Sequence, residues 1–263
     1  MLKLTIFHLY PGIMNLYGDH GNVLTLKKRC EWRNIKIEIV NVKRNDRVDF
    51  KKADLIFMGG GQDRGQKAVV NDLLSRQEAI KTEINKGMAA LTICGGFQLF
   101  GKYFKTTTGE ILEGISVFDA YTVAGQQRCI GNIVVDITGL AEKWALKNKY
   151  YEQNVKLTTL VGFENHSGLT YLESSKPLGN VLIGYGNKAD HSFEGAVEKN
   201  AFGTYLHGPV LPKNPHFADQ LILLALQRRY DSSITLPSIN DDLEHLAHRQ
   251  TINRARTAKT YHL

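Results

Sequence analysis

Apolar and polar residues along the first hundred positions follow the pattern of strands separated by helices. Three apolar runs, at 3–10, 35–42 and 54–58, predict strands. Helical spacing of apolar residues predicts helices at 23–32 and 67–86. Because strands that alternate with helices form parallel sheets covered on both faces, the pattern predicts a three-layer, flavodoxin-like α/β fold with a mostly parallel central sheet.

Beyond Gly109 the apolar runs follow one another without helices between them. We expect them to be antiparallel additions to the parallel core. These strands are predicted at 115–123, 130–137, 157–163, 180–185, 192–197 and 201–206. A helix is predicted at 217–230. With no repeat or linker, the chain is divided into one domain at 1–240 and a basic C-terminal helix or tail at 241–263.

Composition narrows the class of protein. The 263 residues are 43% hydrophobic and 22% charged, which is typical of a soluble globular protein with a real core. No apolar run approaches the roughly 20 residues that span a membrane, and no signal peptide is expected. Three cysteines cannot all pair, which favours a reduced, cytoplasmic setting. The net charge of +7 permits acidic partners but requires none, so neither nucleic-acid binding nor a membrane span is expected.

One short stretch carries the strongest chemical signal. The apolar run at 88–93 ends in Cys94, and Gly95 and Gly96 follow before a helical pattern resumes. This order predicts a strand, a sharp turn and a helix, with the cysteine at the apex. Such an elbow holds a nucleophile above the edge of a parallel sheet. A buried structural cysteine is the equally weighted alternative, because cysteine is commonly buried.

A thiol nucleophile needs a base and donors for an oxyanion. Among nine histidines, His207 and His166 lie in glycine-flanked contexts near strand ends, and the local sequence does not separate them. His8 is predicted to lie in the core. The remaining histidines occupy polar stretches predicted to be at the surface: His20, His191, His216, His245, His248 and His262. Backbone N–H groups of Gly95 and of the Gly59–Gly61 loop are the candidate oxyanion donors.

Motifs for other chemistries are missing from the sequence. Gly60 and Gly65 have the separation of a phosphate loop, but Gln66, Lys67 and Ala68 follow where Lys and then Ser or Thr are needed. No dinucleotide-binding glycine pattern opens the first predicted helix, and no metal-ligand spacing occurs. We therefore expect no cofactor or metal on this chain.

Several motifs together carry a resemblance to a known family. They are Ile93-Cys94-Gly95-Gly96-Phe97-Gln98-Leu99, Gly59-Gly60-Gly61-Gln62, Gly162-Phe163-Glu164-Asn165-His166, Tyr205-Leu206-His207-Gly208-Pro209, the 15–22 stretch and Arg128-Cys129-Ile130-Gly131-Asn132. The chain resembles class I glutamine amidotransferases of the cobyric-acid-synthase type. The last two motifs narrow the resemblance, and within this class the chain resembles the GatD-type glutaminase subunits of the MurT/GatD lipid II isoglutaminyl synthases. The resemblance covers about residues 3 to 240.

This resemblance implies roles for individual residues. Cys94 attacks the side-chain amide of glutamine and His207 transfers the protons. Gly60 or Gly61, together with Gly95, stabilises the tetrahedral oxyanion.

The substrate-binding residues are implied in the same way. Arg128 binds the substrate, where a guanidinium can grip the α-carboxylate of glutamine; without the resemblance, a surface ion pair is the simpler interpretation. Gln98 is expected to line the pocket, with a polar role in the core as the alternative. His166 becomes a loop residue near the active-site face or the partner interface.

Two positions depart from the common class I pattern. Thr92 replaces a glycine before the nucleophile, and Pro209 stands where many relatives have a glutamate after the catalytic histidine. The missing glutamate is expected for the cobyric-acid-synthase-type branch. Cys94 and His207 therefore act as a dyad, or an acid comes from elsewhere in the chain or from a partner.

The resemblance also implies a partner. A separate Mur-ligase-like subunit, in a heterodimer, would use ATP and Mg to amidate the D-glutamate α-carboxylate of lipid II to D-isoglutamine, in the cytoplasm or at the inner membrane face. The alternatives are another ATP-dependent amidation, such as one with a cobyrinate-type acceptor, or a non-catalytic scaffold that binds a ligase. The roles of His166 and of the C-terminal tail are left open.

Overall fold

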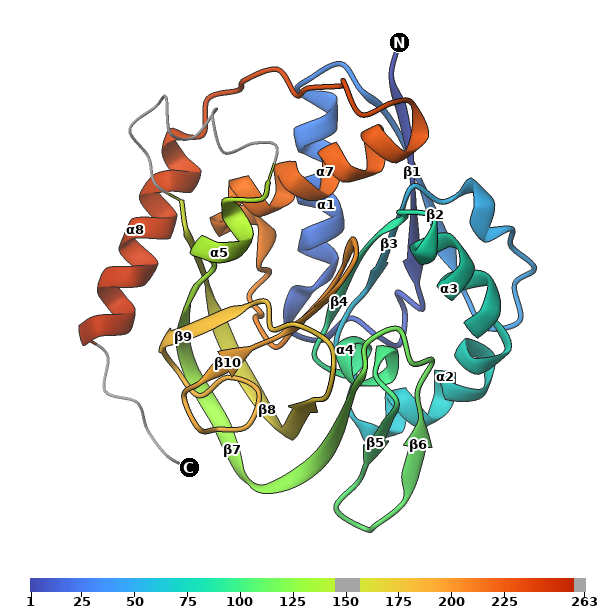
Figure 1. The fold of residues 1–263 in the computed structure, drawn as a ribbon, viewed down its shortest axis with the longest axis vertical. Coiled ribbons are helices and arrows are strands. Elements are labelled where there is room, and N and C mark those ends of the chain that lie inside the picture. Colours follow the sequence, from blue (N-terminus) through green and yellow to red (C-terminus); the bar gives the residue numbers. More distant parts are fainter. Residues whose placement is uncertain (145–156, 258–263) are drawn as a thin grey trace.

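The computed structural model describes residues 1–144 and 157–257, and it confirms the predicted α/β fold (Figure 1). The central sheet has the strand order β11-β12-β4-β3-β1-β2, and every neighbouring pair is parallel except β11 with β12. Its strands are β1 (Lys3–Leu9), β2 (Lys36–Val42), β3 (Leu55–Met58), β4 (Ala89–Ile93), β11 (Ala196–Glu198) and β12 (Ala201–Thr204). The C-terminal ends of the parallel strands meet at one edge, where the candidate nucleophile lies.

Helices cover both faces of this sheet and complete three layers. Figure 1 shows α1 and α7 on one face and α2 and α3 on the other. These helices are α1 (His20–Glu31), α2 (Asp63–Ser75), α3 (Gln77–Asn85) and α7 (Pro215–Arg229). Strand β3 is buried along its whole length and so is β4, as expected for central strands covered on both faces.

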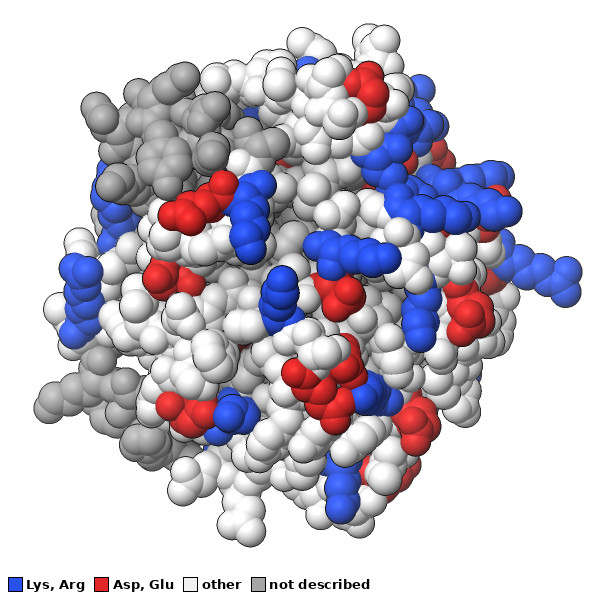
Figure 2. Space-filling model, in the orientation of Figure 1, with Lys and Arg blue, Asp and Glu red and all other residues white. Residues whose placement is uncertain are grey.

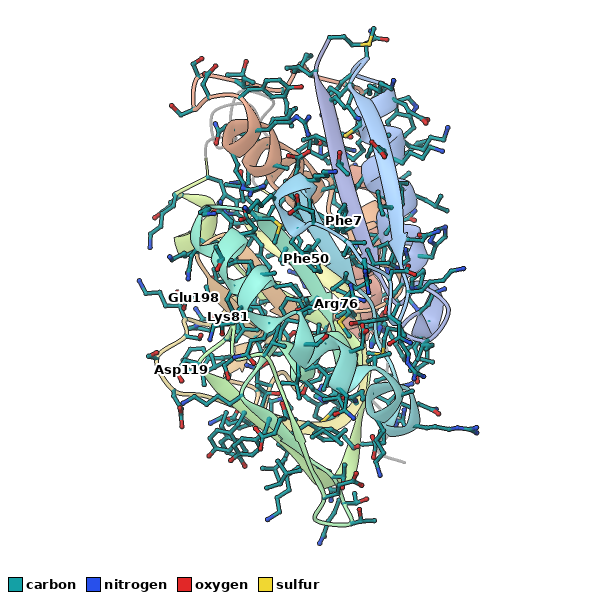
Figure 3. The ribbon with its side chains drawn as sticks, turned by 90° about the vertical axis from the view of Figure 1, so that its right-hand side faces the viewer. Phe7, Phe50, Arg76, Lys81, Asp119 and Glu198 are labelled. Carbon is teal, nitrogen blue, oxygen red and sulfur yellow. The ribbon has the colours of Figure 1, made fainter. Side chains whose placement is uncertain are left out.

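The predicted helix at 67–86 is two helices. Helix α2 begins earlier, at Asp63, and the break before α3 falls at Arg76. The guanidinium of Arg76 bonds back to the carboxylate of Asp72 and to the carbonyl oxygen of Lys43. In Figure 3 these helices lie in front of the sheet, and Phe50 points toward Phe7 of β1, with ring centroids 5.7 Å apart.

Most of the antiparallel strands form a second sheet of their own beside the central one. Its strands are β5 (Tyr103–Lys105), β6 (Ile111–Glu113), β7 (Ala120–Asp136), β8 (Thr159–Leu172), β9 (Gly179–Ile183) and β10 (Phe193–Glu194). Predicted strands at 115–123 and 130–137 merge into the 17-residue β7. The register of β7 against β8 shifts between Ala124 and Cys129, so a bulge replaces the predicted break.

The other helices of the described residues are α4 (Gly95–Phe100), α5 (Thr138–Ala141) and α8 (Asp242–Thr257), with short 3-10 turns at Leu16–Gly18, Phe50–Lys52 and Leu211–Lys213. Helix α8 lies beside the second sheet (Figure 1), where it contacts β7 and β8. Its Ala255 packs on Val134 and Val161. Residues 258–263 of the predicted tail lie outside the described residues.

This packing makes the surface prediction wrong for three histidines. His216, His245 and His248 are buried, while His20 and His191 are exposed as predicted and His262 lies outside the described residues. The ring of His216 lies 5.8 Å from that of His248. A polar sequence context does not reveal this burial, because it follows from the docking of α8.

On the face drawn in Figure 2, basic side chains are unevenly distributed. Figure 2 shows basic and acidic side chains interspersed over much of this face, with Lys and Arg gathered toward its upper right. A groove by the start of β1 is lined by both basic and acidic side chains, among them Lys3, Lys51, Lys52, Arg228 and Arg229 with Glu38, Asp49 and Asp54. None of the helices within the described ranges is long and apolar enough to cross a membrane.

Candidate active site

Cys94 lies at the apex of the turn between β4 and α4, as the sequence predicts. Its backbone has φ 49° and ψ −108°, in a region that non-glycine residues rarely adopt. The strain persists because the turn is fixed on both sides: the N–H of Cys94 donates to Thr204 of β12, and that of Gln98 donates to Cys94. A side chain at Gly96 would clash with two carbonyl oxygens of the β3 end, so glycine is needed there. The thiol is 8% exposed and lines a pocket.

His207 reaches the same place from the end of β12. Its N–H donates to the carbonyl oxygen of Phe163 at 2.7 Å, and the N–H of Phe163 donates back at 3.1 Å. This pair of bonds joins the central sheet to β8 of the second sheet. A Cβ atom built on Gly60 would lie 3.1 Å from Cε1 of His207 and 3.4 Å from Cβ of Cys94. The imidazole and the thiol therefore meet at Gly60.

Asp19, just before α1, is the acidic group that completes this arrangement. Its Oδ1 lies 3.3 Å from Nδ1 of His207, and both side chains are fully buried. Because a carboxylate only accepts, the hydrogen bond to Asp19 is assigned to the proton on Nδ1, and Nε2 is the nitrogen that can gain or lose a proton during a reaction. The other oxygen, Oδ2, accepts the N–H of Gly60 at 2.6 Å. One carboxylate thus orients both the histidine and the glycine loop.

The surroundings of His207 shift its pKa strongly. Burial lowers the pKa of the imidazole, but the hydrogen bond to Asp19 and the neighbouring Cys94 side chain outweigh it and raise this pKa to about 10. The imidazolium form is therefore favoured at neutral pH. This places a positive charge beside the side chain of Cys94.

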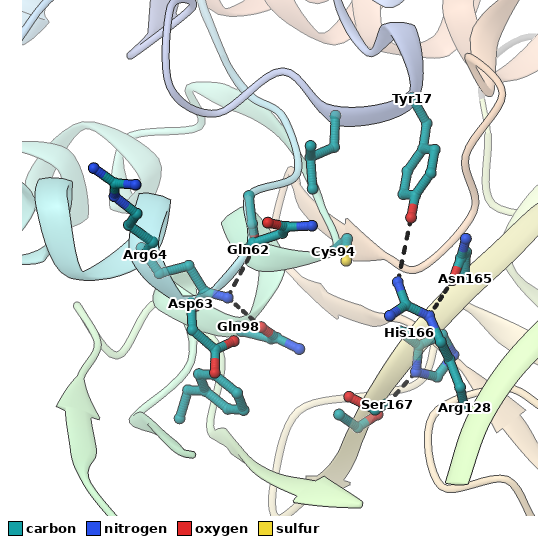
Figure 4. A pocket seen from close by; sticks show the side chains of 15 residues that line it. Tyr17, Gln62, Asp63, Arg64, Cys94, Gln98, Arg128, Asn165, His166 and Ser167 are labelled. Atoms are coloured by element: carbon teal, nitrogen blue, oxygen red, sulfur yellow. Dashed lines mark hydrogen bonds between the residues drawn. The ribbon is translucent and has the colours of Figure 1, made fainter. Parts of the chain in front are cut away.

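The pocket in front of Cys94 has a volume of about 350 Å³ (Figure 4). This size is within the range of small-molecule sites. Its walls come from the 16–17 turn, the start of α2, α4 and the middle of β7 and β8. The lining residues are Leu16, Tyr17, Gly61, Gln62, Asp63, Arg64, Gln66, Cys94, Gln98, Phe104, Arg128, Asn165, His166, Ser167 and Gly168.

Arg128 projects into this pocket from the bulge of β7. Its Nε donates to Oδ1 of Asn165 at 2.5 Å, and one terminal nitrogen donates to the hydroxyl of Tyr17 at 3.3 Å (Figure 4). A guanidinium has five N–H donors, so these two bonds leave others for a ligand. The cation is therefore anchored at the pocket wall with capacity to bind a carboxylate.

Two glycine N–H groups remain as candidate oxyanion donors. The N–H of Gly60 is committed to Asp19, which leaves Gly61 of the predicted pair. A Cβ atom on Gly95 would lie 2.8 Å from the nitrogen of Gly61, so the two backbones pass very close to each other beside Cys94. This close approach requires glycine at position 95.

Comparison with known proteins shows the family of this chain. A family model described as a CobB/CobQ-like glutamine amidotransferase domain matches residues 5–215. The chain belongs to this family of glutamine amidotransferases.

Individual relatives are similar to this chain over most of its length. The chain is 37% identical over 259 residues to the lipid II isoglutaminyl synthase (glutamine-hydrolyzing) subunit GatD of Staphylococcus aureus, and the match covers 98% of this chain and 99% of that one. It is 38% identical over 243 residues to the subunit of the same name from Streptococcus pneumoniae, covering 92% and 87%. The solved structure of a glutamine amidotransferase from Thermotoga maritima shares the fold, with a TM-score of 0.51 at 14% identity over 96% and 92% of the two chains.

Gln98 of the amidotransferase is part of a buried polar network behind the pocket. Its Oε1 accepts from Nε2 of Gln66 at 2.9 Å, and its Nε2 donates to the hydroxyl of Tyr205 at 3.1 Å. The hydroxyl of Tyr205 also bonds that of Thr170. Gln98 therefore both lines the pocket and satisfies core groups, so the two predicted alternatives hold together.

The prediction that His166 lies in a loop is wrong, because the residue lies within strand β8. Its ring stacks on Tyr205 with centroids 3.8 Å apart, and its Nδ1 donates to the carbonyl oxygen of Gly168 at 2.8 Å. Glu164 lies 3.7 Å from its other nitrogen. These contacts hold His166 at the pocket wall, and it is His207 that lies beside the elbow.

Sequence reasoning missed three residues of this site: Asp19, Tyr17 and Asn165. All three lie in quoted motifs, but no spacing rule marks an acid 188 positions before its histidine. The only available signal for Asp19 is an acidic residue between the end of a strand and the start of a helix, on the side where parallel strands carry active sites. Within the described ranges, no group of three or more His, Cys, Asp or Glu side chains is placed to hold a metal ion.

Proposed function

We propose that this chain is the glutamine-hydrolysing subunit of a lipid II isoglutaminyl synthase. Similarity to two such subunits over most of both chains supports the acceptor, because the family alone leaves it open. One observation carries the hydrolytic step: Asp19, His207 and Cys94 come together at the C-terminal edge of the central sheet, beside a pocket with an arginine.

Binding is the first part of the proposed reaction. Arg128 pairs with the α-carboxylate of L-glutamine, and Gln98 lines the wall near its side chain. The side-chain amide then lies against Cys94, with its oxygen toward the N–H groups of Gly61 and Gly95.

In the first chemical step, the Cys94 thiolate attacks the amide carbon, and the negative charge moves to the amide oxygen. The N–H groups of Gly61 and Gly95 stabilise that oxyanion. The Nε2 proton of His207 passes to the nitrogen, the C–N bond breaks, and ammonia leaves. A thioester remains on Cys94.

In the second step, His207 takes a proton from water, and the resulting hydroxide attacks the thioester. The C–S bond breaks and glutamate leaves, so Cys94 is restored as a thiolate beside a protonated His207. Asp19 keeps the imidazole in one orientation through both steps.

The ammonia is used by a second subunit. We propose a MurT-like Mur ligase as the partner, in a heterodimer, because the similar proteins are named as subunits. That partner would bind ATP and Mg and activate the D-glutamate α-carboxylate of lipid II. The complex would work in the cytoplasm, at the inner membrane face where its lipid-linked acceptor lies.

The test compares wild type with Cys94→Ser, using Cys30→Ala as a control because Cys30 lies buried in α1. Glutamate release from glutamine is measured for the full chain, alone and with the ligase partner, together with amidation of lipid II. We expect the serine variant to lose glutamine-dependent turnover while ammonia salts still support amidation. Glutamate release by Cys94→Ser at the wild-type rate would refute the proposal. Amidation of a cobyrinate but not of lipid II would refute the proposed acceptor.

A further inference from the structure

Tyr17 is an aromatic residue that the proposed reaction does not use, although it touches two groups that the reaction needs. It lies in the short turn before Asp19, with φ 53°, and its side chain is 44% exposed at the pocket mouth. A left-handed backbone conformation is uncommon for a bulky residue, so it indicates that the surrounding structure holds Tyr17 in place.

The turn that carries Tyr17 is fixed from several sides. The N–H of Leu16 donates to the carbonyl oxygen of Gly60 at 3.1 Å. The side-chain oxygen of Asn15 accepts the N–H of His20 at 2.7 Å. The turn therefore rests on the glycine loop that lies beside Cys94, and the position of Tyr17 is set by the site itself.

The two ends of the Tyr17 side chain contact different parts of the site. Its ring packs edge to face on the ring of His207, with centroids 4.8 Å apart and planes at 70°. Its hydroxyl accepts a hydrogen bond from Arg128 (Figure 4). In the described part of the chain, this side chain is a direct link from the catalytic imidazole to the guanidinium.

We propose that Tyr17 is a positioning residue that couples substrate binding at Arg128 to the His207 imidazole. The inference rests on the proposed glutamine hydrolysis. The hydroxyl, together with Asn165, holds the guanidinium so that its free N–H groups face the pocket. The ring covers His207 and keeps water from the bond between His207 and Asp19. The hydroxyl thus affects binding, and the ring affects the chemical step.

Two substitutions separate these contributions. Tyr17→Phe keeps the ring on His207 and removes the bond to Arg128. We expect KM for glutamine to rise about five-fold with kcat within two-fold of wild type, because one hydrogen bond to a partly exposed cation is lost. Tyr17→Ala also uncovers His207, so kcat falls as well. Tyr171→Phe, a similarly exposed tyrosine on β8, is the matched control.

Each variant is assayed as the full chain, alone and with the ligase partner, for glutamate release and for labelling of Cys94 by a glutamine-analogue electrophile. Alkylation by iodoacetamide, which has no α-carboxylate, is measured against pH. We expect its pH profile to be unchanged in Tyr17→Phe and shifted in Tyr17→Ala. A merely structural role would lower thermal stability without this split between KM and kcat.

The outcomes distinguish the two proposals. If Tyr17→Phe has the same kcat and the same KM for glutamine as the wild type, the role of Tyr17 is overturned and the proposed hydrolysis is left intact. An alkylation profile in Tyr17→Ala identical to that of wild type overturns the role of the ring. Absence of both turnover and analogue labelling in the wild type overturns the two proposals together.

Discussion

Replacing Asp19 with asparagine tests the least expected group of the site. The carboxylate has one oxygen 3.3 Å from His207 and the other 2.6 Å from the N–H of Gly60. Asparagine has the same shape and keeps an oxygen to accept the N–H of Gly60. The variant therefore removes the negative charge beside the imidazole while leaving the glycine loop in place.

The expected loss follows from the geometry. Both partners are fully buried, so water does not compensate for the missing charge. A hydrogen bond to a charged group contributes about 1.5 to 3 kcal/mol. If this energy is present only when His207 is protonated and aligned, kcat falls by about 10-fold to 150-fold. KM should change little, because Asp19 is not among the residues that line the pocket.

The pH dependence has a definite sign. Burial lowers the pKa of His207, and the hydrogen bond to Asp19 is the largest of the effects that raise it to about 10. Without the carboxylate this pKa falls. Since His207 must be protonated to donate to the leaving nitrogen, the high-pH limb of kcat/KM should move to lower pH.

The assay is glutamate release over a range of glutamine concentrations between pH 6 and 10, which gives both kcat and kcat/KM. Asp190→Asn, which changes an exposed carboxylate on another loop, is the control. Circular dichroism checks that the variant is folded. Wild-type kcat and an unmoved high-pH limb in a folded Asp19→Asn protein would refute the role of Asp19 and return the site to a dyad.

Two further predictions concern the backbone and the core. Gly95→Ala places a Cβ atom 2.5 Å from the carbonyl oxygen of Gly61, so kcat should fall by about 100-fold. Gly12→Ala, which has open space around it, is the control and should keep full activity. Equal rates of glutamate release by the two variants would contradict the prediction. Burial raises the pKa of Glu194 from 4.5 to about 7, so the stability that its protonated form contributes is present below pH 4.5 and is lost as the pH rises through 7. Glu194→Gln lacks this loss, and its free energy of unfolding relative to wild type should rise by about 3 kcal/mol between pH 4 and pH 8 in urea titrations; a constant difference would disprove the reasoning.

The local sequence is sufficient for the elements of the central sheet. Alternating apolar runs and helical periods predict β1, β2, β3 and β4 within a few residues, because buried parallel strands require such runs. The turn at Cys94 can also be predicted from local sequence, because Gly95 and Gly96, which permit the tight turn, directly follow the cysteine. The second sheet is harder to predict from the local sequence. Whether 115–137 forms two strands or one bulged strand depends on its pairing with β8, from Asp136 with Thr159 to Ala120 with Leu172, and these partners are not neighbours in the sequence.

The amino-acid sequence by itself determined the fold class, the elbow and the family, because each rests on residues that are neighbours along the chain. Only the tertiary structure decided which groups surround the nucleophile. Asp19 and His207 are 188 positions apart and meet because β1 and β12 end at the same edge of one parallel sheet. Arg128 reaches that edge from a bulge in another sheet. Contacts between such distant segments follow from strand order and register, which periodicity does not encode.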